Sequence, residues 1–303
     1  MEAGLSGQKG ILYAGDIRPL FDEKTFWDFY KKMPEERRNK IDAFRFKEDR
    51  CRSLLAGILL EEALSERGIP ERERKISLTE EGKPFLSEHP EIYFSLSHSG
   101  NMAMCLIADV PCGSDVEEIK ADGKILKIAD RFFTENERAY ISGAAQFESR
   151  PAGAAQAEEE CGPEEKDFPA SDSPQAEDAL NAETLRRFYR IWTRKESFLK
   201  ATGRGMSLEL TSFSVPLPEE EISFSSSNVK DSEKEDSFMA SLQGGDFSFK
   251  SFGESMIFSG PKGDEACRFV QFPDMENYAL ACCFLGEGPF EISVRNEGTM
   301  LFC

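Results

Sequence analysis

Three carboxylates in two separate segments are the first candidates for chemistry. Asp115 and Glu117 stand two positions apart in a predicted β-strand over residues 114–119, so we expect both side chains on the same face. Glu196 lies in a predicted helix over residues 183–202, near the middle of an apolar arc, where a carboxylate must be neutralised, hydrogen-bonded or bound to a cation. Together the three acids would form an all-oxygen site of the kind that Mg²⁺ prefers.

Simpler explanations account for each of these acids taken alone. Two acids that alternate along a strand are most often an exposed strand face. Glu196 would be neutralised by Lys200, which follows four positions later on the same helix. Lys195 and Lys200 fall on the two edges of the apolar arc. The spacing by itself therefore leaves both the internal salt bridge and the metal site open.

Basic residues in the first half of the chain are candidates for binding phosphate. Arg37 and Lys40 begin a predicted helix, Arg52 lies further along it, and Lys83 occupies a Gly-Lys-Pro turn. His98, at the tip of a predicted hairpin, is an anion ligand or an acid–base group on this interpretation. A solvated charged face and a turn histidine bonded to backbone are the alternatives.

The composition excludes several classes of partner. The 303 residues carry 37 Lys and Arg against 56 Asp and Glu, a net charge of −19 that argues against binding to nucleic acid or to anionic lipid. No apolar run approaches the roughly 20 residues needed to span a bilayer. No secretory signal is visible, and none of the eight cysteines forms a C-x-x-C pair. We expect an acidic cytoplasmic protein with buried, reduced thiols.

The order of predicted elements indicates an α+β chain in two related lobes, residues 1–111 and 112–303. We expect a disordered acidic insertion at about 144–182 and a loop-rich insertion at about 217–263, both within the second lobe. The predicted elements are a strand at 11–14, helices at 26–33 and 35–67, hairpin strands at 92–97 and 102–108, a strand at 114–119, a helix at 124–133, a further helix beginning with a capping box at 134–137, a helix at 183–202, and strands at 267–272, 278–284 and 290–294.

Three motifs in this order resemble those of a known family. They are the Ser-His-Ser sequence at 97–99, the Gly-Ser-Asp-Val-Glu sequence at 113–117, and the run W-x-x-K-E-S-x-x-K-x-x-G-x-G at 192–205. The sequence resembles the 4′-phosphopantetheinyl transferases of the larger, surfactin-synthetase-activating type. Residues 36–40, 44–55 and 82–84 are similar to the N-terminal half of that family, and the resemblance covers nearly all of the chain outside the two insertions.

The resemblance implies two pseudo-twofold-related α+β lobes with coenzyme A bound in the cleft between them. The implied reaction is Mg²⁺-dependent transfer of 4′-phosphopantetheine from coenzyme A to a serine of an apo acyl or peptidyl carrier protein, with release of adenosine 3′,5′-bisphosphate. It also implies a monomer. The alternative is a non-catalytic coenzyme A binding module, and the acidic balance disfavours a third possibility, a Mg²⁺-dependent nuclease.

The resemblance also implies roles for individual residues. Asp115, Glu117 and Glu196 match the Mg²⁺ ligands. Lys200 matches a lysine near the phosphates, and the candidate base is Glu196 or a metal-bound water, so Glu196, Lys200 and Asp115 are the predicted catalytic residues. The residues that match coenzyme A contacts are Arg37, Lys40, Arg52, Ser53, Lys83, Pro84, Ser97, His98 and Lys195.

Overall fold

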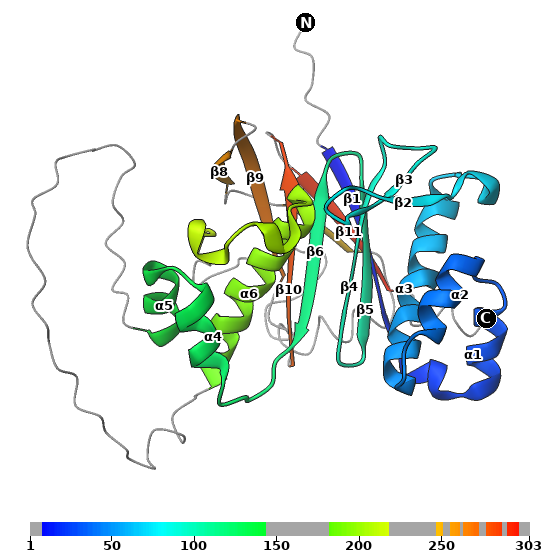
Figure 1. Cartoon of the computed structure of the whole chain (residues 1–303), viewed down its shortest axis with the longest axis horizontal. Helices are drawn as coiled ribbons and strands as arrows, with labels where there is room; N and C mark the ends of the chain where they lie inside the picture. The colour runs from blue at the N-terminus through cyan, green and yellow to red at the C-terminus, as the bar shows by residue number, and fades with distance from the viewer. Residues whose placement is uncertain are drawn as a thin grey trace, which may run out of the picture.

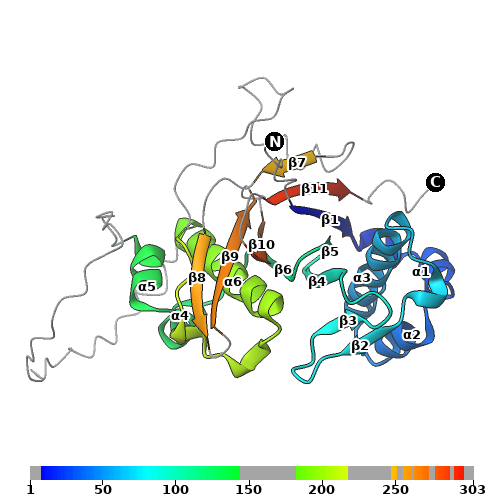
Figure 2. The same cartoon turned by 90° about the horizontal axis from the view of Figure 1, so that it is seen from above.

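Two β-sheets, each covered by one long helix, form the part of the chain that the structure describes (Figures 1 and 2). The structure is a computed structural model, and it describes residues 8–143, 182–217, 247–250, 255–260, 263–272, 277–286 and 290–296. The first sheet has the strand order β4-β5-β1-β11-β7, the second has the order β6-β10-β9-β8, and a separate hairpin is formed by β2 and β3.

The elements of the first lobe occupy the N-terminal third of the chain. They are β1 (Gln8–Asp16), η1 (Arg18–Phe21), α1 (Glu23–Tyr30), α2 (Glu35–Asp42), α3 (Lys47–Glu66), η2 (Glu71–Glu73), β2 (Ile76–Leu78), β3 (Pro84–Leu86), β4 (Tyr93–Ser99) and β5 (Met102–Ala108).

The remaining elements follow Pro111. They are β6 (Cys112–Glu118), α4 (Ile125–Phe132), α5 (Glu135–Ser142), α6 (Ala182–Thr202), η4 (Gly205–Ser207), η5 (Leu210–Ser212), β7 (Phe247–Lys250), β8 (Ser255–Gly260), β9 (Gly263–Gln271), β10 (Tyr278–Leu285) and β11 (Phe290–Asn296).

The two lobes repeat one topology. In the first lobe, β1 leads through helices to α3 and then to the hairpin β4–β5, whose second strand pairs antiparallel with β1. In the second lobe, β6 leads through helices to α6 and then to the antiparallel pair β9–β10, whose second strand pairs antiparallel with β6. The predicted α+β class with two lobes of similar topology is confirmed.

The lobes share an apolar core. On β5, side chains at 103, 105 and 107 pack toward α3, whereas those at 102, 104, 106 and 108 pack against the second sheet. On β10, Leu280, Cys282 and Phe284 face the first sheet, and Cys283 faces the core beneath α6. The layers are therefore helix, sheet, sheet and helix, which explains why β5 is buried along its whole length.

The predicted domain boundary needs one correction. The boundary at 111/112 separates β1–β5 from β6, β8, β9 and β10, but β11 pairs in parallel with β1, and β7 pairs with β11. Since β5 covers only one side of β1, its other side is free to pair with the C-terminal strand. The second half of the chain thus contributes two strands to the first sheet.

The predicted continuous helix over residues 35–67 is also wrong, because the chain turns at residues 43–46. The sequence of α2 is mostly charged, and its one buried residue is Ile41. By contrast, α3 buries ten of its residues, and Phe46 precedes it in an extended conformation. Breaking the helix lets Ile41 and the apolar side of α3 reach the same core.

Other predictions have mixed outcomes. The hairpin β4–β5 and the capping box at Thr134 and Glu137 are confirmed. The acidic insertion predicted at 144–182 lies outside the described residues except for its last position. Most of the insertion predicted at 217–263 also lies outside them, apart from residue 217, β7, β8 and residue 263. Among the helices that the structure describes, none has the length and unbroken apolar sequence needed to span a bilayer.

At Gly113, the backbone of α6 packs directly against β6. A Cβ atom placed there would lie 1.9 Å from the carbonyl oxygen of Ser197 and 2.4 Å from the backbone nitrogen of Ala201. Both atoms are backbone, so no side chain can move aside, and the helix itself would have to shift.

We expect Gly113→Ala to lower the free energy of unfolding by about 3 kcal/mol or more, at or above the upper limit typical of overpacking. Urea unfolding measures this change. The matched control is Gly123→Ala, where no atom lies within 4 Å of the added Cβ, so stability should be unchanged. A Gly113→Ala protein as stable as Gly123→Ala would show that α6 does not sit against β6 in this way.

Candidate active site

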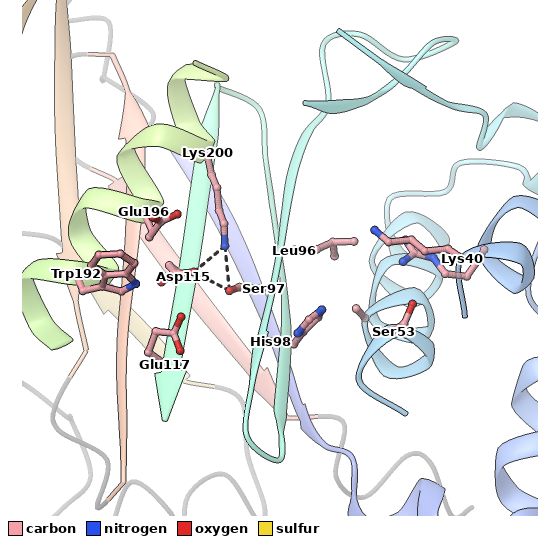
Figure 3. A pocket seen from close by; sticks show the side chains of 12 residues that line it. Lys40, Ser53, Leu96, Ser97, His98, Asp115, Glu117, Trp192, Glu196 and Lys200 are labelled. Carbon is pink, nitrogen blue, oxygen red and sulfur yellow. Dashed lines mark hydrogen bonds and ion pairs between the residues drawn. The ribbon is translucent and has the colours of Figure 1, made fainter. Parts of the chain in front are cut away.

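A cavity of about 420 Å³ lies between the lobes, where the edge strands β4 and β6 run side by side (Figure 3). The first lobe contributes side chains from α2, α3 and β4, and the second contributes side chains from β6 and α6. The lining residues are Arg37, Lys40, Ser53, Ala56, Leu96, Ser97, His98, Asp115, Glu117, Trp192, Glu196 and Lys200. Nine of the predicted site residues thus meet at one place.

The second-lobe side of the cavity carries the three predicted carboxylates, and we call Asp115, Glu117 and Glu196 the acidic wall. Asp115 is only 4% exposed. Burial raises the pKa of Glu117 and of Glu196, and the charge of Asp115 raises both further. The carboxylates therefore repel one another in a partly desolvated cavity, and an added cation would relieve that repulsion.

Lys200 supplies part of the missing positive charge. Its Nζ lies 2.7 Å from Oδ1 of Asp115 and 3.0 Å from Oγ of Ser97, and Ser97 donates to the same Asp115 oxygen at 2.8 Å (Figure 3). In place of the alternative pairing with Glu196 along the helix, Lys200 forms its ion pair with Asp115 of β6. Lys200 thus joins α6 to β6 of its own lobe and, through Ser97, to β4 of the first lobe.

The carboxylate oxygens of the acidic wall are the type of ligand that a hard cation such as Mg²⁺ prefers. Oδ2 of Asp115 is buried and has no hydrogen-bond partner among the described residues, which is costly for a carboxylate oxygen unless a cation or water satisfies it. Among the residues that the structure describes, no three His, Cys, Asp or Glu side chains are close enough to hold a metal ion as placed. The acidic wall therefore gathers suitable ligands at one cavity without closing them around a single point, and the three-carboxylate metal site stays a prediction.

The first-lobe side of the cavity carries Arg37, Lys40 and His98, which we call the basic wall. Burial lowers the pKa of all three. The neighbouring charge of Arg37 lowers the pKa of Lys40 further, and that of Arg52 does so for His98. Clustered, partly desolvated cations such as Arg37 and Lys40 gain most when an anion binds between them. Ser53 adds a buried hydroxyl with no hydrogen-bond partner in the described part of the chain.

Lys195 is not at this cavity, and its predicted contact with coenzyme A phosphates is wrong. The side chain is fully buried in the second lobe, where Nζ lies 3.0 Å from Oε2 of Glu137 and donates to the carbonyl oxygens of Leu210 and Phe213. Glu137 is the acid of the predicted capping box, and it also accepts from the backbone of Val215. Lys195 thus links α6 to α5, to η5 and to the segment that follows η5.

The helical-wheel interpretation of α6 is also wrong, because elements other than the sheet pack around this helix. It placed Glu196 at the centre of the buried arc and Lys195 at its edge. In the structure, α6 is packed on most of its circumference, against its sheet and against α4, α5 and the segment at 210–215. The arc that contains Trp192, Glu196 and Lys200 faces the cavity instead.

Three further predicted contacts lie outside the cavity lining. Arg52 donates to the carbonyl oxygen of Gly100 and pairs with Asp49. Nζ of Lys83 donates to the carbonyl oxygen of Ala201 at 2.7 Å and to that of Cys112 at 3.3 Å, so it ties the β2–β3 hairpin to the C-terminal end of α6. Pro84 begins β3 and pairs with Leu78. Contacts of these residues with a nucleotide stay predictions.

Trp192 is a lining residue that was not predicted as part of the site. Its ring stacks on Phe188 with 6.0 Å between centroids and packs near Phe133, so the helix core holds it in place beside Glu196. The signal for it was present, because Trp192 is the first residue of the 192–205 motif and lies one helical turn before Glu196.

Comparisons with known proteins identify the family of the chain. A sequence model described as the 4′-phosphopantetheinyl transferase superfamily matches residues 111–283, more than half of the chain. The chain belongs to this superfamily. A second model, described as the N-terminal part of 4′-phosphopantetheinyl transferase, matches residues 21–110 of this transferase. The predicted enzyme class is therefore confirmed, and the non-catalytic binding module is not favoured.

Individual proteins similar to this chain are also named 4′-phosphopantetheinyl transferases. The transferase is 32% identical to 4′-phosphopantetheinyl transferase Sfp of Bacillus subtilis (strain 168) over 203 residues, which cover 66% of this chain and 73% of that protein. It is 30% identical to 4′-phosphopantetheinyl transferase psf-1 of Bacillus pumilus, over 69% of this chain and 76% of the relative. A fungal relative, 4′-phosphopantetheinyl transferase pptA of Paxillus involutus, is 27% identical over 61% of this chain and 64% of its own length.

Removing Lys195 should destabilise the fold rather than weaken phosphate binding directly. Lys195→Ala leaves the fully buried Glu137 without its cation, and we expect the free energy of unfolding to fall by about 3–5 kcal/mol in chemical denaturation. The exposed Lys127→Ala is the control and should behave as the parent protein. A Lys195→Ala protein of unchanged stability that loses only ligand affinity would contradict the buried role.

The two histidines should titrate on opposite sides of the ordinary value of about 6.5. Burial and the charge of Arg52 lower the pKa of His98, whereas hydrogen bonds to Glu73 and Glu91 raise the pKa of His89. Protonation of His98 thus opposes folding as the pH falls below its unfolded pKa. The stabilisation from His89 is complete below its unfolded pKa and disappears as the pH rises through its folded pKa.

Proton NMR titration of the two imidazole C2–H signals tests this, with His89→Gln to assign them. A His98 signal that titrates above about 6.5 would contradict the burial and charge environment described for the basic wall.

Proposed function

We propose that this transferase binds coenzyme A in the cavity between its lobes and transfers the 4′-phosphopantetheine group to a serine hydroxyl of an apo acyl or peptidyl carrier protein. Adenosine 3′,5′-bisphosphate is the second product. The observation that carries the proposal is the opposite charge of the two walls of one cavity. A nucleotide diphosphate requires cations for its phosphates, and a divalent ion that accompanies it requires carboxylates.

The basic wall would bind the phosphates of coenzyme A. Arg37 and Lys40 extend from α2, and His98 extends from β4 on the same side of the cavity. Their desolvation favours an anionic partner. The hydroxyl of Ser53, which is buried and without a partner among the described residues, is placed to donate to the same ligand.

The acidic wall would hold Mg²⁺ through Asp115, Glu117 and Glu196. The unpartnered Oδ2 of Asp115 and the raised pKa of the other two carboxylates support this assignment. When bound, the ion would neutralise charge on the diphosphate and favour departure of the leaving phosphate.

The reaction forms a bond between the carrier serine oxygen and the phosphorus on the pantetheine side, and it breaks the bond from that phosphorus to the bridging oxygen. The serine proton must pass to a base. Glu196 is suited to this role, because its carboxylate lines the cavity between the two lobes. Lys200 carries positive charge into the cavity, where it can stabilise negative charge that develops on the phosphoryl oxygens.

A monomeric state and a cytoplasmic location stay predictions of this proposal. So does the absence of nucleic acid and membrane partners, which was inferred from net charge and hydropathy alone.

The proposal is tested by the mass of apo carrier protein after incubation with coenzyme A, Mg²⁺ and the transferase. We expect the carrier to gain the mass of one phosphopantetheine group, and Glu196→Gln to reduce the rate by about 100-fold or more, since it removes a base or ligand. Glu118→Gln is the matched control, because Glu118 is a carboxylate of the same β6 strand that pairs with Lys120 outside the cavity lining.

Failure to modify any of several diverse apo carriers would count against the transferase activity. Tight binding of coenzyme A without turnover would instead favour the non-catalytic alternative.

A further inference from the structure

Three serines at alternate positions of β4 connect the two sheets, and we call them the serine ladder. No backbone ladder joins β4 to β6, which belong to different sheets. Instead, each serine hydroxyl accepts a hydrogen bond from an alternate backbone N–H of β6. The pairs are Ser114 N–H to Ser95 at 2.9 Å, Val116 N–H to Ser97 at 3.3 Å, and Glu118 N–H to Ser99 at 3.0 Å.

Two of the three rungs also hold a carboxylate of the acidic wall. The hydroxyl of Ser97 donates to Oδ1 of Asp115 at 2.8 Å, and the hydroxyl of Ser99 donates to Oε2 of Glu117 at 2.7 Å. The corresponding β6 position beside Ser95 is Gly113, which has no side chain because α6 packs against it. The ladder therefore contains two rungs with a carboxylate and one without.

The hydrogen bonds of the two rungs show which oxygen of each carboxylate is already engaged and which is left for a cation. A hydroxyl has a single proton, and since the β6 N–H occupies an acceptor position on the serine oxygen, that proton is directed to the neighbouring carboxylate. Ser97 and Lys200 both contact Oδ1 of Asp115 and leave Oδ2 unpartnered. Ser99 contacts Oε2 of Glu117 in the same way, so that Oε1 is the oxygen left for a cation.

From this arrangement we infer that Ser99 is a positioning residue, which orients Glu117 for binding a divalent cation. The inference rests on the proposed function, because it assumes that Glu117 is a metal ligand. Hydrogen-bonded partners of metal ligands typically change metal affinity by about 10- to 100-fold when they are removed. The same reasoning assigns no such role to Ser95, whose rung holds no carboxylate.

Ser99→Ala and Ser95→Ala form a matched pair for the test. Each variant deprives one β6 N–H of its hydroxyl acceptor, but only Ser99→Ala also releases a carboxylate. The full-length proteins are titrated with Mn²⁺ in the absence of coenzyme A, and free Mn²⁺ is followed by electron paramagnetic resonance. We expect Ser99→Ala to weaken Mn²⁺ binding by about 10-fold or more, and Ser95→Ala to stay within about twofold of the parent protein.

Two conservative variants separate the hydrogen bond from the volume of the side chain. Ser99→Thr keeps the hydroxyl and is expected to restore Mn²⁺ binding. Ser99→Cys keeps the approximate volume but donates weakly, so it should bind Mn²⁺ about as poorly as Ser99→Ala. Thermal unfolding of the two alanine variants checks that both are folded to the same extent.

The outcomes distinguish the inference from the function on which it rests. Equal affinities for Ser99→Ala and Ser95→Ala, or binding by Ser99→Cys as tight as that of the parent, would overturn the positioning role while leaving the metal site intact. If the parent protein binds no Mn²⁺, or if Glu117→Gln binds it unchanged, the proposed metal site itself fails, and the role of Ser99 fails with it.

Discussion

The balance of charge around Asp115 is the constraint on which the site depends. Three carboxylates in one partly buried cavity raise each other's free energy, and burial makes water a poor screen between them. Lys200 offsets part of that repulsion through its contact with Asp115. Because Lys200 and Glu196 come from one helix and Asp115 from a strand, the balance holds only if α6 lies directly against β6. Gly113 makes that approach sterically possible.

The duplicated topology explains how such a cavity can carry opposite charges. Each lobe brings a long helix and an edge strand to the same place, but the first lobe supplies cations from α2 and the imidazole of His98 from β4, while the second supplies acids from β6 and α6. The apolar core shared by the two sheets, together with the return of β11 to β1, fixes the distance between the walls.

The serine ladder reconciles two demands on the strands between the walls. Buried backbone N–H groups need acceptors, and the acidic side chains that alternate with them need donors. One hydroxyl per rung meets both needs, as Ser97 and Ser99 do. Carbonyl groups in an ordinary strand pairing would satisfy the N–H groups but could donate nothing to Asp115 and Glu117.

The sequence by itself determined the order of most elements, the capping box at Thr134 and the set of acids that share one cavity, because these follow from local periodicity and from motifs. Only the tertiary structure decided which of two adjacent residues, Lys195 and Glu196, faces the cavity. A helical wheel gives only the angular positions of side chains around one helix. The burial of Lys195 depends on Glu137, which lies on another helix. The pairing of β11 with β1 and the contacts of Lys83 with α6 could not be predicted for the same reason, because their hydrogen-bonding partners are distant in sequence.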